Sequence, residues 1–158
     1  KEKSFSITMY HQVQPWHPQG TICHEAGLAV GTLSGHDAFF KFSDELFAVA
    51  KDRFFDANTF DMTRNDLIKG VCEIASTTAT ADPEEVKKLL AMLVVQDENS
   101  VYAKNPGTSM TQDLKFHTKF ARQNGIHVSP TTTLNGLIFE SSSSWGLEEW
   151  KEALDPLF

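Results

Sequence analysis

The sequence is poor in cysteine, the residue from which dithiol redox centres and cysteine-rich zinc sites are built. Its two cysteines, Cys23 and Cys72, lie far apart, so the chain holds neither a CxxC dithiol nor a cysteine-rich zinc site. One disulfide between them and two free thiols are both open, and free thiols are favoured because cysteine is among the most buried residue types. The cellular compartment therefore stays open.

Clustered positive charge is missing as well. Fourteen Lys and Arg stand against 21 Asp and Glu, which gives a net charge of -7 in 158 residues. Because nucleic-acid binders neutralise phosphates with clustered Lys and Arg, no nucleic-acid partner is predicted. No apolar run of about 18 residues is present, so no membrane span is predicted. The opening "KEKSFSITMY" lacks the pattern of a signal peptide, and a signal cleaved before Lys1 stays open.

Patterns typical of hydrolytic enzymes are also lacking. There is no GxSxG motif, and the serines of "SSSSW" are typical of a loop and a helix cap. Neighbouring carboxylates diverge by about 100° on a helix, which suits a solvated face rather than general acid/base chemistry. No catalytic residue and no resident cofactor is therefore predicted. The neighbouring carboxylate pairs are Asp44 and Glu45, Glu84 and Glu85, and Glu148 and Glu149.

The chain begins with a strand predicted over Phe5 to Tyr10, where residues that favour β-structure alternate. Strong helical periodicity follows. The first helix is expected over "GTICHEAGLAVGTL" with Thr21 as N-cap. The second covers "HDAFFKFSDELFAVAKDRFF", whose stripe of Phe39, Phe40, Leu46, Phe47 and Phe54 is assigned to the core. Further helices are predicted after Thr63, after Asp82 with Pro83 at the first position, and over "MTQDLKFHTKFARQN" up to Gly125.

Beyond Gly125 the spacing of apolar residues changes from the helical period to the two-residue period of a β-strand. Asn135-Gly136 joins two short β-runs, which predicts a hairpin, and "SSSSWGLEEWKEAL" closes the chain with a helix that presents Leu147, Trp150 and Leu154. An early strand, a long helical block and a late antiparallel pair indicate one α/β domain with a thin, three-stranded sheet.

Three segments carry a resemblance to a known family. "HVSPTTTLNG" resembles the cis-proline segment of the thioredoxin superfamily. "HEAGLAV" followed by "DAFFKFSDELF" resembles the DsbA-like disulfide oxidoreductases, and "EEWKEALDPLF" is similar to the end of plant and fungal DsbA-like proteins. The resemblance implies a thioredoxin-like (DsbA-like) α/β sheet over 1–158, with a helical insertion at about 36–124, and it slightly favours the secretory pathway or the extracellular space.

Two alignments with this family compete at the segment "VQPWH". In the first, Gln14 and His17 occupy the two cysteine positions of "VCPWC", and neither side chain can supply the thiolate of thiol-disulfide exchange. In the second, the redox strand and helix would precede Lys1. The second is favoured, because the first needs another strand between residues 34 and 62, which are helical in pattern throughout.

The junction "QPWHPQ" is interpreted as a stiff strand-to-helix turn. Pro15 and Pro18 restrict its backbone, and Trp16 is expected to plug the edge of the core. Metal binding by His11, His17 and His24 is disfavoured, because they fall on three different elements without a carboxylate at a known ligand spacing.

The best candidate site implied by the resemblance is Val128, Ser129, Pro130 and Thr131, together with Trp16 and His17. In this superfamily the backbone beside the cis-proline pairs with an extended peptide or with glutathione. Cys23, near a helix start, is a possible reactive thiol. The chain is thus expected to be a redox-inactive or truncated DsbA-like member. The alternative is a module that binds a peptide, a partner protein or glutathione.

Overall fold

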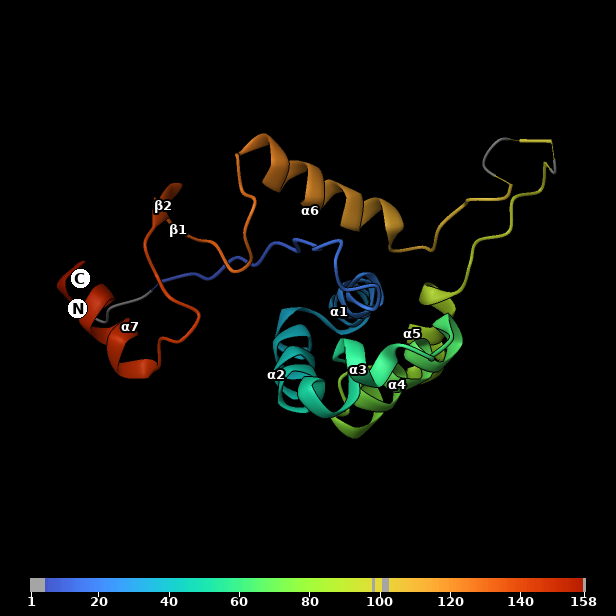
Figure 1. Cartoon of the computed structure of the whole chain (residues 1–158), viewed down its shortest axis with the longest axis horizontal. Coiled ribbons are helices and arrows are strands. Elements are labelled where there is room, and N and C mark those ends of the chain that lie inside the picture. Colours follow the sequence, from blue (N-terminus) through green and yellow to red (C-terminus); the bar gives the residue numbers. More distant parts are fainter. Residues whose placement is uncertain (1–4, 98, 101–102, 158) are drawn as a thin grey trace. The chain divides into compact units, whose positions relative to one another are not determined.

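The computed structural model describes residues 5–97, 99–100 and 103–157. The helices and strands of this part are seven α-helices, one 3-10 helix and two β-strands (Figure 1). In chain order they are α1 Gly20–Ser34, α2 His36–Arg53, α3 Asp56–Thr59, α4 Arg64–Thr77, α5 Pro83–Leu90, α6 Thr111–Gln123, β1 Thr132–Leu134, β2 Leu137–Phe139, α7 Leu147–Leu154 and η1 Asp155–Leu157.

The chain divides into two compact units. The helical unit is His11–Lys119, and the hairpin unit joins Lys1–Tyr10 to Phe120–Phe158. Helix α6 runs across the division between them.

The core of the helical unit forms around α1, which packs against α2, α4 and α5 (Figure 1). Small residues on α1 let its neighbours approach closely, since Ala26 and Ala29 are fully buried. Phe42 from α2 and Val71 from α4 fill the space beside them. Burial of these apolar side chains is the main favourable term in the folding of this unit.

Local capping signals position these helices as the sequence predicts. Thr63 caps α4 in a reciprocal capping box with Asp66, and Asp82 accepts hydrogen bonds from the backbone N–H groups of Glu84 and Glu85 at the start of α5. At α1 the expected cap is displaced, because Gln19 rather than Thr21 is the N-cap residue.

The predicted α/β fold class, a thioredoxin-like sheet with a helical insertion, is wrong. The structure is mostly helical, and among the described residues the sheet has only two strands, β1 and β2. The expected strand over Phe5 to Tyr10 is not a strand. Alternating β-formers favour an extended backbone, but a strand exists only where a neighbour completes the ladder of hydrogen bonds.

The hairpin itself is confirmed. β1 pairs antiparallel with β2, with Thr132 opposite Phe139 and Leu134 opposite Leu137. Asn135 and Gly136 form the turn with φ of 51° and 86°, the left-handed conformations that a two-residue hairpin turn requires.

An aromatic cluster lies behind the hairpin. Phe139 stacks on Trp150 with ring centroids 6.4 Å apart, and Trp145 meets Trp150 edge-on at 5.0 Å. Helix α7 has no fully buried residue, and the predicted apolar-face residue Leu147 is exposed. The aromatic rings therefore support one side of a hairpin unit that keeps much apolar surface exposed.

No helix in the described part of the chain combines the length and apolar character needed to cross a membrane.

Candidate functional site

The segment before β1 has the backbone that the resemblance implies. The Ser129–Pro130 peptide bond is cis. Val128, Ser129 and Pro130 are exposed, and Thr131 is half-buried. The Thr131 hydroxyl donates a hydrogen bond of 2.6 Å to the carbonyl oxygen of Val128. This bond closes a tight turn that leads directly into β1.

The hairpin offers two strand edges. Since the sheet contains β1 and β2 alone among the described residues, each strand has one edge without a neighbouring strand. In a hairpin closed by a two-residue turn, the residues next to the closing pair point their N–H and C=O groups outward. By the observed register these residues are Thr133 on β1 and Ile138 on β2. Their backbone groups are the natural points of attachment for an added strand.

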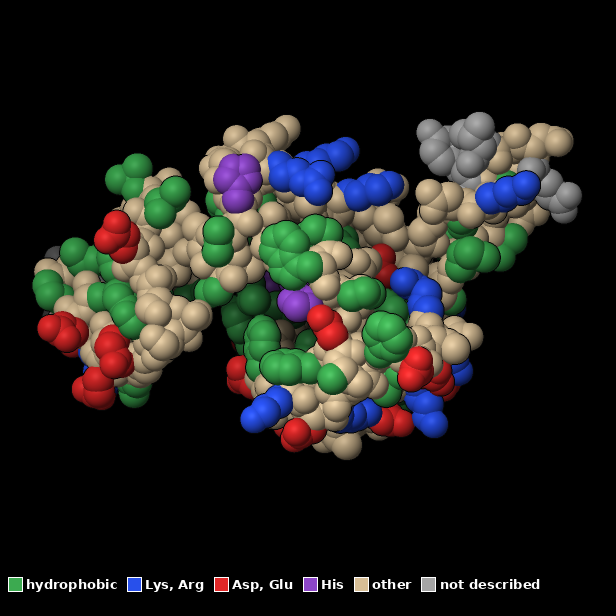
Figure 2. Space-filling model, viewed as in Figure 1, with side chains coloured by type: hydrophobic (Ala, Val, Ile, Leu, Met, Phe, Trp, Pro, Cys, Tyr) green, Lys and Arg blue, Asp and Glu red, His purple; other side chains and the backbone are tan. Residues whose placement is uncertain are grey.

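Exposed apolar side chains lie on the hairpin, and an acidic segment follows it in the sequence. Leu137 and Ile138 are 75% and 70% exposed. Residues 126–139 contain no Lys, Arg, Asp or Glu, whereas residues 140–158 contain five carboxylates and one lysine. That lysine, Lys151, is 2.8 Å from Glu148 on α7. Figure 2 shows hydrophobic and acidic side chains side by side over α7.

The remaining predicted site residues lie in the helical unit, whereas Pro130 belongs to the hairpin unit. Trp16 is 64% exposed, so the expectation that it plugs the core is wrong. His17 is also exposed, and its Nδ1 lies 3.0 Å from Asp56. The structure thus places Trp16 and His17 on a surface turn, where His17 makes a local hydrogen bond to Asp56.

The turn at "QPWHPQ" is confirmed, but residues 5–10 before it are not a strand, and its anchor is Gln19, to which no role was assigned from the sequence. Gln19 is buried, and its Nε2 donates to the carbonyl oxygen of Phe54 at 2.7 Å and to Asp56 Oδ1 at 2.9 Å. The hydrogen bond from Gln19, followed by that with His17, lowers the pKa of the Asp56 carboxyl. The prolines therefore stiffen a turn that Gln19 fastens to the junction of α2 and α3.

Both cysteines are free thiols. Burial raises the pKa of Cys23 to about 11, and it does the same for Cys72, which is also raised by the charge of Glu84. A thiol with such a pKa is protonated at neutral pH, so the start of α1 does not activate Cys23.

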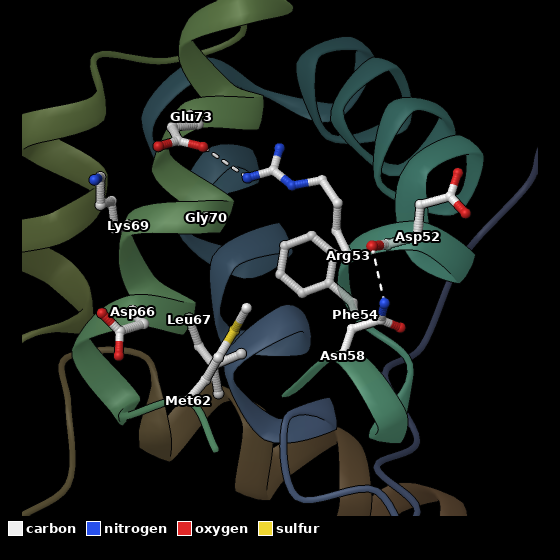
Figure 3. A pocket seen from close by; sticks show the side chains of 10 residues that line it. All are labelled: Asp52, Arg53, Phe54, Asn58, Met62, Asp66, Leu67, Lys69, Gly70 and Glu73. Carbon is white, nitrogen blue, oxygen red and sulfur yellow. Dashed lines mark hydrogen bonds and ion pairs between the residues drawn. The ribbon is translucent and has the colours of Figure 1, made fainter. Parts of the chain in front are cut away.

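A pocket of about 510 Å³ opens among α2, α3 and α4 (Figure 3). Two of its charges pair with each other, since Arg53 Nη2 lies 2.6 Å from Glu73. The Arg53 guanidinium carbon also lies 5.6 Å from the centre of the Phe54 ring. Asn58 Nδ2 donates to the carbonyl oxygen of Asp52 at 3.1 Å. The pocket is lined by Asp52, Arg53, Phe54, Asn58, Met62, Asp66, Leu67, Lys69, Gly70 and Glu73.

The structure separates His11 and His24 from His17, the third histidine considered as a metal ligand. His11 and His24 meet, with 2.8 Å between their Nδ1 atoms, whereas His17 contacts Asp56. Within the described ranges, no group of three or more His, Cys, Asp or Glu side chains is placed to hold a metal ion.

Comparison with known proteins yields no relative: no protein-family model, no curated protein and no solved structure matches the chain.

Proposed function

We propose that this chain is a protein-binding module without a catalytic dithiol, related to the DsbA-like oxidoreductases, that takes up an extended peptide along the outer edge of β1 beside Pro130. The observation that carries the proposal is a sheet in which neither outer edge pairs with another strand of the described residues, with Leu137 and Ile138 exposed. Native proteins rarely leave such edges bare, because unpaired backbone groups pair readily with another chain. In β-augmentation the backbone supplies affinity, and alternate side chains supply specificity.

The charges around the hairpin support a partner of particular chemistry. The hairpin residues 126–139 carry no acidic or basic side chain except His127, and the charged residues after them are five carboxylates and one lysine. A segment with β-branched or apolar residues in the middle and Lys or Arg at its ends would match both features. Because the flanking contacts are exposed, raised salt would weaken the binding.

The cysteine chemistry supports a role in binding rather than in turnover. Thiol-disulfide exchange needs one thiolate to attack and a second sulfur to leave. Cys23 and Cys72 are both held as neutral thiols, with pKa values raised to about 11. Glutathione, the other ligand that the resemblance implies, has a net negative charge, so the acidic surroundings favour a basic peptide over it.

Calorimetric titration with designed peptides tests the proposal. The probe is a short peptide of alternating Val and Thr with Lys at both ends, and the control peptide carries Glu in place of Lys. Thr133→Pro removes the outward N–H of β1, and Ile138→Pro removes that of β2 as the matched control. We expect saturable binding of the Lys peptide, an affinity at least tenfold lower for Thr133→Pro, and little change for Ile138→Pro.

The fluorescence of Trp145 and Trp150 reports whether each variant keeps its hairpin unit folded, because both rings pack with Phe139. A folded Thr133→Pro variant that binds as tightly as the parent would overturn the assignment to β1. Absence of binding by the Lys peptide would overturn the proposal as a whole.

A further inference from the structure

Three histidines from distant parts of the sequence converge inside the helical unit. They are His11, which precedes the turn, His24 on α1 and His117 on α6. The ring of His11 meets the rings of His24 and His117 edge-on, with centroids 5.1 Å and 5.3 Å apart. The backbone N–H of His11 also donates to Nδ1 of His117 at 3.4 Å. The cluster thereby joins three segments at one point.

The surroundings of His11 within the cluster are apolar and close-packed, while His24 and His117 are half-buried. His11 is only 6% exposed, and its ring meets that of Phe39 from α2 at 5.5 Å. A Cβ atom on Gly27 would lie 3.3 Å from Cε1 of His11 and 3.1 Å from Phe39, so α1 has a glycine where the imidazole lies against its backbone. Little room is left for water to solvate an imidazolium there.

The hydrogen bonds require neutral rings. Two Nδ1 atoms 2.8 Å apart form a hydrogen bond only if one carries a proton and the other does not, so at least one of His11 and His24 is neutral. Nδ1 of His117 likewise accepts the hydrogen bond from the backbone N–H of His11 only while this nitrogen is unprotonated. Protonation of these rings would turn each acceptor into a donor and bring like charges together.

We propose that His11, His24 and His117 form an acid-sensitive joint that holds residue 11 and α6 against α1 at neutral pH and releases them when the histidines become protonated.

The charges around the joint support this direction. Burial, and then the charges of His24 and His117, lower the pKa of His11 to about 3. Burial and His117 lower the pKa of His24. Burial lowers the pKa of His117 as well, while Asp113 on the same helix acts to raise it. From α2 the cluster meets the uncharged ring of Phe39.

The sign of the pH dependence follows from these shifts. Histidines freed from the joint take up protons below about pH 6.5, whereas those in the closed joint resist protonation down to their lowered pKa. The opening equilibrium therefore rises as pH falls, by up to tenfold per pH unit for each of the three histidines, from about pH 6.5 down to the lowered values.

Hydrogen exchange of the full chain, corrected for the intrinsic effect of pH, tests the joint. We expect α6 amides up to His117 to lose protection between about pH 7 and 5, before those of α4 do. In His24→Gln and His117→Gln the new side chain can hydrogen-bond but cannot take up a proton. Each replacement therefore removes one factor of about tenfold per pH unit from the pH dependence of the opening equilibrium. His36→Gln, on the exposed start of α2, is the matched control and leaves the slope unchanged.

Two results would overturn the proposal. One is that α6 and α4 lose protection together, and the other is that the slope survives in both glutamine variants. If those variants fail to fold, NMR titration of the parent chain decides the matter through the three imidazole Cε1–H signals. Neutral rings in the closed state, with α6 released as they protonate, support the joint. Titration of all three near pH 6.5 without any change in α6 rules it out.

Discussion

Glu25 gives the sharpest test of how α6 is fixed to the helical core. This residue of α1 is buried, with 3% of its side chain exposed, and its Oε1 accepts hydrogen bonds of 3.0 Å from the hydroxyls of Thr108 and Thr111. Arg64 Nη2 on α4 donates to Oε2, also at 3.0 Å. One carboxylate thereby ties α1 to α4 and to the start of α6.

The magnitude follows from these contacts. A hydrogen bond to a charged group contributes about 1.5 kcal/mol at the lower end of its range, so the two hydroxyls together contribute about 3 kcal/mol. Arg64 is 48% exposed, and its ion pair therefore adds less than about 1 kcal/mol. We expect Glu25→Ala to lower the free energy of unfolding by about 3 kcal/mol, and Glu25→Gln by roughly half as much, since its amide oxygen can still accept.

Urea denaturation followed by far-UV circular dichroism measures this difference. Glu73→Ala is the matched control, because it removes an ion pair with Arg53 whose two side chains are 39% and 50% exposed, and its expected cost is below about 1 kcal/mol. An equal, small loss in Glu25→Ala and Glu73→Ala would refute the reasoning, because the buried network would then contribute no more than a surface pair.

Three further outcomes are expected. Phe42→Ala, at a fully buried position of α2, should lower the free energy of unfolding by about 3 to 5 kcal/mol in the same denaturation assay. Phe47→Ala, on the exposed face of α2, should lower it far less, and equal losses would contradict the described core. Asp82→Ala should cost about 1 kcal/mol through the loss of the α5 cap, and no change would mean that the cap contributes nothing. Alkylation of Cys23 by iodoacetamide at pH 8 should be about a hundredfold slower than that of an unperturbed thiol, because the Cys23 pKa is raised from 9.0 to about 11. Labelling at the rate of an unperturbed thiol would contradict the burial of Cys23.

Features set by neighbouring residues could be predicted from the sequence. The capping pair Thr63 and Asp66, the Asp82 cap and the Asn135-Gly136 turn all act within a few residues, and all three stand as predicted. The stripe on α2 was only partly predicted, because Phe39 is buried while its neighbour Phe40 is exposed. A three- and four-residue period identifies an apolar face, but the packed neighbours decide how much of it is covered.

Features that depend on distant residues were missed. The expected strand at Phe5 to Tyr10 needed a partner that local pattern does not reveal, and the α/β fold class failed with it. His117 approaches His11 across 106 positions, and Thr108 approaches Glu25 across 83. A lone histidine or threonine on a predicted helix or loop carries no local signal for such contacts. Only Glu25, a carboxylate among apolar residues of α1, hints that a polar partner is needed.

The central claim, that β1 receives an extended peptide, is tested most directly by amide exchange of Thr133 and Ile138 with and without the Lys-flanked peptide, measured residue by residue by NMR. The account predicts that saturation with the peptide slows exchange of the Thr133 amide at least tenfold and leaves that of Ile138 unchanged. Protection of Ile138 alone, or of neither amide at saturation, would contradict it.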